Sequence, residues 1–241
     1  MKRFALIGHP LAGSLSPVLF GAAYDGRYPY DLLDYPAFED AWMAFLEDGY
    51  TGINVTAPFK QDAFAAVDRL SPAARLTGAV NLVVRRGGAL WGYNTDVDGV
   101  LGALASAVVP SALVVGTGGA ARAAVAACLQ LGCEVTIAGR SPEKVSALAA
   151  AFGCSGCDLA ACGSLQPSLV IYTLPSSAPV PSGLPLADAL VLEAEYKRPS
   201  LDQVQCRRYI SGRQWLLWQA MAGYKLFTGE EPSFEKMSAA L

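Results

Sequence analysis

Residues 112–132 read ALVVGTGGAARAAVAACLQLG, an apolar run, a cluster of glycines and an alanine-rich stretch in immediate succession. The apolar run is typical of a buried strand and the alanine-rich stretch of a helix. Between them, Gly116, Gly118 and Ala121 fill the pattern GxGxxG/A, in which missing side chains let a pyrophosphate reach the backbone and the free amides of the helix. A second strand, EVTIAG, follows. A tight turn without a ligand is the alternative, but this context favours a nucleotide-binding βαβ unit.

The second strand of this unit runs into Arg140. A carboxylate near this position favours a free 2′-hydroxyl on the cofactor, whereas an arginine favours a 2′-phosphate. Arg140 offers a planar fork of donors to phosphate, and Lys144 adds a point charge one turn further on. The alternative is that SPEK only starts a helix, with Ser141 as N-cap and Pro142 in the first turn. Both can hold together, so the sequence favours NADP over NAD.

The whole chain alternates short apolar runs with helical patterns, which predicts an α/β fold with parallel strands. Near the start, RFALIG, YDLLDY and TGINVTA are typical of strands, and helices are expected between them near 17–25 and 36–48. AVNLVVRRGGALWGY then predicts a hairpin with glycine in its turn. Around the glycine turn we expect a second series of alternating strands and helices. Its strands are SALVVG, EVTIAG, 169–174 and 189–194, and its helices are 120–131 and 142–152.

A chain of 241 residues can form one large domain or two, and the two series of elements favour two. The C-terminal stretches RQWLLWQAMAGYKLFTG and SFEKMSAAL are helical and are expected to pack back on the first domain. We therefore expect a substrate-binding α/β domain at 1–99, completed by helices in 214–241, and an NADP-binding Rossmann-type doubly wound parallel sheet at 100–213.

The composition restricts the class of protein and its partners. The chain is 53% hydrophobic and 16% charged, which excludes a disordered protein. A formal net charge of −3 gives no broad basic surface for nucleic acid or an anionic membrane, so a small-molecule partner is expected. The apolar run before His9 and Pro10 is too short for a secretory signal, and Arg122 interrupts the other apolar candidate. We expect a soluble cytoplasmic protein, monomeric or homodimeric.

Three of the six cysteines form the pattern CxxCxxxxC, for which a metal or redox site is one interpretation. They are Cys154, Cys157 and Cys162. A tetrahedral zinc site needs a fourth Cys or His, and the single histidine, His9, is far away in the sequence. Reduced thiols in buried or loop positions are the favoured interpretation, without a metal.

Polar side chains in the first half gather where the predicted strands end. In an open α/β sheet, ligands bind beyond the carboxyl ends of the strands, so several of these side chains are expected to converge. Hydroxyls, amides and a Lys/Asp pair suit a small polyhydroxylated acid. The residues are Ser14, Ser16, Asn54, Thr56, Lys60, Asn81, Asn94, Thr95 and Asp96.

Seven blocks in order resemble the shikimate dehydrogenase family: LIGHPLAGSLSP, GINVTAPFK, TGAVN, GYNTDVDG, VVGTGGAARA, AGRSPEK and GRQWLLWQAMAGYKLFTG. The resemblance implies NADPH-dependent, reversible reduction of 3-dehydroshikimate to shikimate, a step of chorismate and aromatic amino acid biosynthesis. It implies Lys60 and Asp96 as the catalytic pair. The substrate positions that it implies are Ser14 and Ser16 for the carboxylate, Thr56, Asn81 and Gln219 for ring hydroxyls, and Tyr196 near the carboxylate. The cofactor positions that it implies are Gly116, Gly118, Gly119, Ala120, Arg140, Ser141 and Lys144.

The chemistry of this pair can also be argued from the residues themselves. Hydride delivered to a ketone leaves negative charge on oxygen, which needs a proton donor or a cation within hydrogen-bond reach. Lys60 can be either, and Asp96 would hold its ammonium in place and favour the charged form. The alternatives are a solvent-facing lysine after Pro58 and, for Asp96, a simple N-cap.

Some positions depart from the family pattern, and we expect them at the rim of the substrate site. Two alternatives therefore stay open: a quinate or other shikimate-like hydroxy acid as substrate, or an NADP-binding regulatory protein without turnover. The Lys60/Asp96 pair argues against the second, because a sensor needs no proton donor. The departures are Gly13 for His, Phe20 and Gly21 for His and Asn, Leu82 for Thr, Gly139 for Asn and Trp215 for Met.

Overall fold

The structure is a computed structural model that describes residues 2–105 and 107–241. Its contacts divide the chain into two compact units. One contains the described residues up to Gly99 together with Leu217–Leu241, and the other contains Val100–Leu216. Within the described residues, none of the helices combines the length and the apolar character that a membrane span requires.

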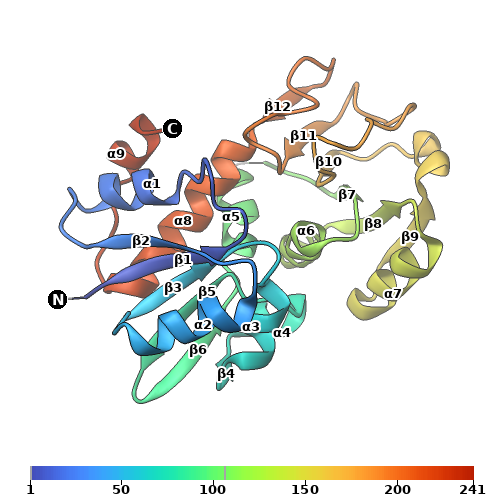
Figure 1. The fold of residues 1–241 in the computed structure, drawn as a ribbon. Coiled ribbons are helices and arrows are strands. Elements are labelled where there is room, and N and C mark those ends of the chain that lie inside the picture. The colour runs from blue at the N-terminus through green and yellow to red at the C-terminus, as the bar shows by residue number, and fades with distance from the viewer. Residues whose placement is uncertain (1, 106) are drawn as a thin grey trace. The chain divides into compact units, whose positions relative to one another are not determined.

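The first unit is built on a six-stranded mixed sheet of order β2-β1-β3-β5-β6-β4 (Figure 1). β1 pairs in parallel with β2 and β3, and β5 runs antiparallel to β3 and β6, so the predicted hairpin is confirmed. The strands are β1 Phe4–Gly8, β2 Tyr30–Asp34, β3 Gly52–Val55, β4 Arg69–Leu70, β5 Leu82–Arg86 and β6 Ala89–Tyr93. The helices are α1 Ser16–Ala23, α2 Phe38–Glu47, α3 Lys60–Ala66, α4 Pro72–Thr77 and α9 Phe234–Ala239, while α5 Asp96–Ala103 and α8 Gly212–Thr228 each extend across a unit boundary.

Two groups of apolar side chains form the core of this unit. α2 contributes Phe45, which is fully buried with Ile7 and Ile53, and Trp42 packs against the same cluster. The second group is aromatic: the ring of Phe4 stacks on Phe227 with centroids 4.8 Å apart. Because α8 supplies Phe227, the C-terminal helix is part of the core of the first unit.

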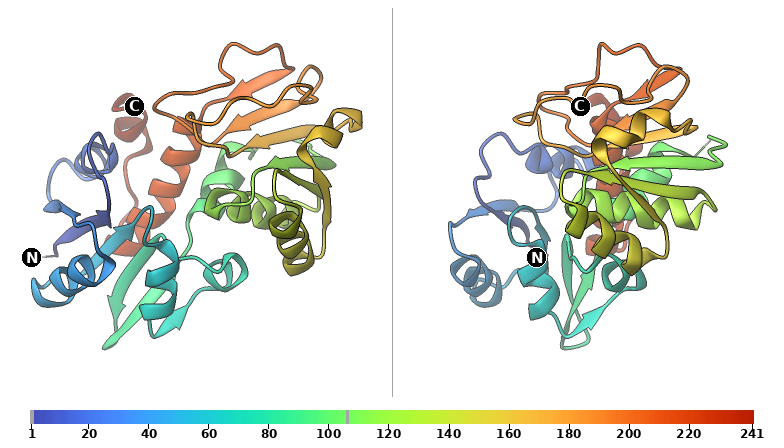
Figure 2. Two further views of the ribbon diagram at one scale, coloured as in Figure 1. Left: turned by 45° about the vertical axis from the view of Figure 1, so that its right-hand side comes forward. Right: turned by 90° about the vertical axis from the view of Figure 1, so that its right-hand side faces the viewer.

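The second unit is a six-stranded sheet of order β12-β11-β10-β7-β8-β9, in which every pair is parallel. α6 packs on β7, β8 and β10, α7 packs on β8 and β9, and the two helices touch (Figure 2). β10 and β11 are buried throughout and β7 from Ala112 onward, as expected for continuous apolar runs in parallel sheets. The elements are β7 Ser111–Val115, α6 Gly119–Gln130, β8 Glu134–Gly139, α7 Pro142–Phe152, β9 Ser155–Asp158, η1 Leu159–Ser164, β10 Leu169–Tyr172, β11 Leu190–Glu193 and β12 Arg208–Ile210.

The predicted α/β fold with a Rossmann-type parallel sheet is confirmed, and β7 lies at its switch point. The strand order reverses here, because β7 pairs with β8 on one side and with β10 on the other. Ligands of open α/β sheets bind at such a point, beyond the carboxyl ends of the strands. The glycine turn after β7 is located at this point.

Candidate active site

The structure brings Lys60 and Asp96 into direct contact. Lys60 is the first residue of α3 and Asp96 the first of α5, and Lys60 Nζ donates to Asp96 Oδ2 over 2.6 Å. Their side chains are 27% and 12% exposed, so water screens the pair only partly. An ammonium held in this way can act on a negative charge beside it without leaving its carboxylate.

Asn81, which lies just before β5, orients the carboxylate of that pair. Its side-chain nitrogen donates to Asp96 Oδ1 and to Gln219 Oε1, each at 3.0 Å. Its side-chain oxygen, Oδ1, accepts from the Thr95 backbone amide at 2.8 Å. Asn81 and Asp96 are buried. The structure therefore joins four of the predicted site residues, Lys60, Asp96, Asn81 and Gln219, into one hydrogen-bonded network.

Asn94 completes the frame around this network. Its side-chain oxygen accepts from the Asp96 amide at 3.1 Å, and its nitrogen donates to Thr77 Oγ1 at 2.8 Å. Asp96 is thus held by side chains that follow the hairpin and by the end of α4. The N-cap alternative for Asp96 does not describe this arrangement, because Asp96 is the first helical residue and its carboxylate contacts Lys60 and Asn81.

The two predicted carboxylate-binding serines lie on one turn at the start of α1. The Ser16 amide donates to Ser14 Oγ at 3.3 Å, and the Ser16 carbonyl accepts from Tyr224 at 3.1 Å. Behind them, burial raises the pKa of Tyr30 well above its usual value, so its hydroxyl stays neutral and donates to Asn54 Oδ1 at 2.8 Å. Sequence reasoning missed Tyr30, because a tyrosine at the start of a strand carries no signal of such a contact.

Thr56 follows β3 and lies against the end of β1. A Cβ on Gly8 would be only 2.3 Å from Thr56 Cγ2, so glycine is required there for the close approach. The neighbouring loop is tied down by Asp34, whose carboxylate accepts from the Leu11 amide at 3.0 Å and lies 2.8 Å from His9 Nδ1. These two contacts lower the pKa of Asp34. His9 is accordingly a loop residue tied to the end of β2.

Two departures from the family pattern are core replacements and do not line the rim. Phe20 is 1% exposed and packs against the ring of Tyr224 with centroids 4.8 Å apart. Leu82 is fully buried, and a Cβ on Gly223 of α8 would be 2.7 Å from its Cδ1. The expectation that the departures lie at the rim is therefore wrong for Phe20 and Leu82.

The glycine turn after β7 has the geometry that a bound pyrophosphate needs. Gly116 has φ of +123°, and a Cβ there would be 2.3 Å from Thr173 Oγ1, so only glycine fits. At Gly118 and Gly119, in contrast, a Cβ would meet nothing within 4 Å, so the space above them is open. α6 starts at Gly119 with no side-chain cap, which leaves its first amides to a ligand.

The predicted 2′-phosphate residues lie between β8 and α7. Arg140 and Lys144 are exposed. Ser141 is the N-cap of α7: its Oγ accepts from the Lys144 amide at 3.3 Å and donates to Glu143 Oε2 at 2.8 Å. The capping interpretation of SPEK therefore describes Ser141, and it leaves the two cations available to an anion.

Tyr196 belongs to the second unit, in the loop after β11, and is half-buried, which raises its pKa. The buried carboxylate of Glu193 holds this loop, since it accepts from the Ser200 amide at 2.6 Å and from Tyr209 at 2.7 Å. Sequence reasoning missed Glu193, which looked like the last residue of an ordinary apolar strand.

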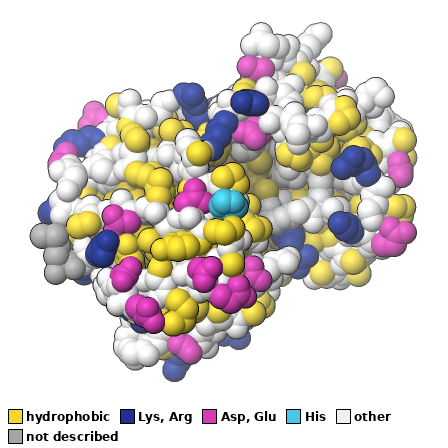
Figure 3. Space-filling view, in the orientation of Figure 1, with side chains coloured by type: hydrophobic (Ala, Val, Ile, Leu, Met, Phe, Trp, Pro, Cys, Tyr) yellow, Lys and Arg dark blue, Asp and Glu magenta, His cyan; other side chains and the backbone are white. Residues whose placement is uncertain are grey.

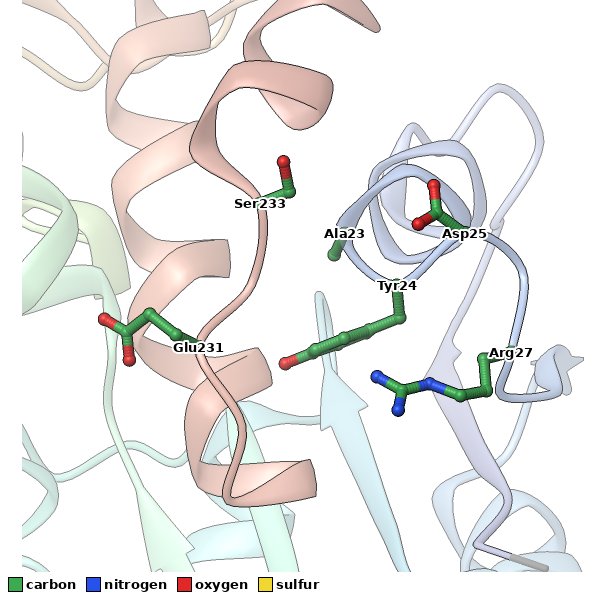
Figure 4. A pocket seen from close by; sticks show the side chains of 6 residues that line it. All are labelled: Ala23, Tyr24, Asp25, Arg27, Glu231 and Ser233. Atoms are coloured by element: carbon green, nitrogen blue, oxygen red, sulfur yellow. The ribbon is translucent and has the colours of Figure 1, made fainter.

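The cysteine cluster and one pocket contain none of the predicted site residues. Burial raises the pKa of Cys154, Cys157 and Cys162, which keeps these free thiols neutral, and nowhere in the described ranges do three or more His, Cys, Asp or Glu side chains gather as a metal site. The face in Figure 3 mixes acidic and basic side chains without a continuous basic patch. A pocket of about 330 Å³ is lined by Ala23, Tyr24, Asp25, Arg27, Glu231 and Ser233 (Figure 4).

A parallel sheet with a glycine turn at its switch point, joined to a second α/β unit with a Lys–Asp pair, is the architecture of two-domain dehydrogenases of the Rossmann type. A family model described as the shikimate dehydrogenase substrate binding domain matches residues 6–83. A curated shikimate dehydrogenase (NADP(+)) from Thermus thermophilus is 34% identical and one from Halobacterium salinarum 38%, with 100% of this chain covered in both cases and 97% and 98% of the relatives. The chain belongs to the shikimate dehydrogenase family.

Solved structures agree with this membership. Shikimate 5-dehydrogenase from Thermus thermophilus in complex with NADP(H) and shikimate superposes with a TM-score of 0.85 at 31% identity, covering 100% of this chain and 98% of that one. Shikimate dehydrogenase from Mycobacterium tuberculosis superposes with a TM-score of 0.86 at 29% identity, covering 100% of this chain and 98% of that one.

Proposed function

We propose that this protein catalyses the NADPH-dependent, reversible reduction of 3-dehydroshikimate to shikimate in the pathway to chorismate and the aromatic amino acids. The observation that carries the proposal is the Lys60–Asp96 contact of 2.6 Å, fixed by Asn81 and Gln219. Full-length similarity to relatives named shikimate dehydrogenase (NADP(+)) supports the substrate and the cofactor.

Lys60 is proposed to act on the oxygen that is reduced. With NADPH as the source of hydride, the carbonyl oxygen gains negative charge as the carbon is attacked, and the ammonium beside it donates a proton or stabilises the alkoxide. Asp96 uses one oxygen to hold Lys60 Nζ and the other to accept from Asn81, so the carboxylate cannot turn away. In the oxidative direction the same groups receive the proton from the hydroxyl.

The first unit is proposed to bind the substrate. Ser14 and Ser16 would hold its carboxylate, and the turn that brings them together supports this assignment. Thr56, Asn81 and Gln219 would contact ring hydroxyls, and the assignment of Tyr196 to the substrate stays a prediction. Gln219 Oε1 accepts from Asn81 at 3.0 Å, which fixes the direction in which Gln219 presents its amide nitrogen.

The second unit is proposed to bind NADP. The backbone of Gly116, Gly118, Gly119 and Ala120 would receive the pyrophosphate, because the space above Gly118 and Gly119 is open. Arg140 and Lys144 would bind the 2′-phosphate, with Ser141 between them. The cytoplasmic location and the monomeric or homodimeric state stay predictions.

The test is the oxidation of NADPH by the purified protein with 3-dehydroshikimate, run beside NADH and, in the reverse direction, beside quinate. We expect turnover with 3-dehydroshikimate, a much higher kcat/KM for NADPH than for NADH, and a higher kcat/KM for shikimate than for quinate. A higher value for quinate would favour the other hydroxy acid. Tight NADPH binding without any turnover would favour a regulatory protein.

A further inference from the structure

The end of β8 lacks a side chain at the position where Rossmann-type units contact the adenosine ribose. Gly139 occupies it, and a Cβ there would lie 2.9 Å from Val145 Cγ2 and 3.1 Å from Thr117 Cγ2. The methyl group of Thr117 and the side chain of Val145 therefore fill the space that a larger residue 139 would take. Whatever such a side chain would donate to the cofactor has to come from elsewhere.

Thr117 lies in the glycine turn itself, directly beside that position. β7 and β8 pair up to Val115 and Ala138, and the Gly116 amide donates to the Ala138 carbonyl at 2.8 Å, so the two strand ends are joined. Thr117 is partly exposed. Its methyl group faces Gly139, and across the part of the chain that the structure describes its hydroxyl has no hydrogen-bond partner. Packing alone would be served equally well by valine.

The other hydroxyl near this edge is already in use. Ser141 Oγ donates its proton to Glu143 at 2.8 Å while it accepts from the Lys144 amide, so it has no proton left for a phosphate. A hydrogen bond from the backbone amide of Glu143 and a second one from Ser141 lower the pKa of the Glu143 carboxyl, which keeps it ionised and able to accept the Ser141 proton. Arg140 and Lys144 supply charge, and with Ser141 engaged it is the Thr117 hydroxyl that can donate to an anion here.

We propose that the Thr117 hydroxyl donates a hydrogen bond to the 2′-phosphate of the adenosine half of NADP, together with Arg140. This inference rests on the proposed function, in that NADP is the cofactor. The Thr117 hydroxyl, in the glycine turn, would then supply the hydrogen bond that a side chain at position 139 cannot supply here. Thr117 thereby becomes a residue that distinguishes NADP from NAD.

The experiment uses two fragments of the cofactor, 2′,5′-ADP and 5′-AMP, titrated calorimetrically into the full-length protein. Thr117→Val keeps the methyl groups that pack on Gly139 and removes only the hydroxyl, and Thr117→Ser keeps the hydroxyl. We expect Thr117→Val to bind 2′,5′-ADP about tenfold more weakly, because one hydrogen bond to a charged group is lost. Its affinity for 5′-AMP should change less than about twofold. Thr117→Ser should bind 2′,5′-ADP within about twofold of the original protein.

The outcomes separate this inference from the function on which it rests. Unchanged binding of 2′,5′-ADP by Thr117→Val, or an equal loss for both fragments, would overturn the role of Thr117 while leaving NADP as the cofactor. If the unsubstituted protein itself bound the two fragments equally, the NADP assignment would fail, and the proposal with it. Thermal unfolding of both variants, expected to match the original protein, controls for misfolding.

Discussion

The two cationic sites of this protein differ in how their cations are held. Lys60 is 27% exposed and is fixed at 2.6 Å from Asp96, which Asn81 in turn orients. Arg140 and Lys144 are exposed, and no ion pair holds either of them within residues 2–105 and 107–241. The first site is organised before a ligand arrives, whereas the second depends on the ligand to order it. Substitutions in the first should therefore change turnover, and substitutions in the second should change cofactor affinity.

Asp96→Asn should have the largest effect of the following substitutions. It removes the negative charge that holds the Lys60 ammonium, while it keeps the shape of the side chain. We expect kcat to fall about 100-fold with little change in the Kd for NADPH. Steady-state rates and a fluorescence titration measure the two quantities. Asp62→Asn, at an exposed carboxylate in the first turn of α3, is the matched control and should keep most of the activity.

Gly116→Ala tests whether the glycine turn is fixed by the fold. A Cβ at this residue would be 2.3 Å from Thr173 Oγ1 at a φ of +123°, so we expect a loss of about 3 kcal/mol in the free energy of unfolding. Gly118→Ala is the control, since a Cβ there meets nothing within 4 Å. Urea denaturation of both variants is the measurement, and equal stability would show that the turn tolerates a side chain at residue 116.

Arg140→Ala tests the second cationic site, where Arg140 is proposed to bind the 2′-phosphate. Loss of the guanidinium should raise the KM for NADPH about tenfold, with kcat and the KM for NADH nearly unchanged, because only NADPH carries the 2′-phosphate. Kinetics with both cofactors measure the effect. A parallel rise of both KM values would mean that Arg140 stabilises the loop and does not recognise the phosphate. Arg122→Ala, on α6, serves as a control for the loss of a positive charge in this unit.

Ser141→Ala should have the smallest effect. It removes the N-cap of α7, so the free energy of unfolding should fall by about 1 kcal/mol. Because the hydroxyl is occupied by Glu143, cofactor affinity should change by less than about twofold. A large loss of NADPH affinity without a loss of stability would assign Ser141 to the phosphate itself.

The sequence predicted the long elements of both units and the six-residue α9, but it missed several other short elements. β7 and β8 are apolar runs next to a glycine turn, and such runs are recognisable without a partner. β9, with the sequence SGCD, and the two-residue β4 have no alternation to detect. α4 is six residues long, too short for a helical period, although Ser71 caps its start and Gly78 ends it at a φ of +63°.

At the site, residues that follow strands could be listed from the sequence, but their connections could not. The network from Gln219 to Lys60 joins segments far apart in the chain, and only the paired strands bring Asn81 beside Asp96. Tyr30, Asp34 and Glu193 escaped notice because each looks like an ordinary first or last residue of a strand. Their roles depend on which strand lies next to them, which a single sequence does not reveal.

The pH response of the Asp34 contact follows from its geometry. The Leu11 amide and His9 lower the pKa of Asp34 below its ordinary value of 3.8, so the carboxylate stabilises the folded loop above that value. The contribution is lost as the pH falls through the lowered pKa. Asp34→Asn should remove this acid dependence from the unfolding curve.

The most direct test of the account is Lys60→Ala, with turnover and NADPH binding measured on the same preparation. We expect kcat for 3-dehydroshikimate to fall by about 10³-fold while the Kd for NADPH stays within about twofold. Lys225→Ala, at an exposed lysine that pairs with Glu231, controls for the loss of charge in the same unit. Near-normal turnover by Lys60→Ala would contradict the central claim that this ammonium, held by Asp96, acts on the reduced oxygen.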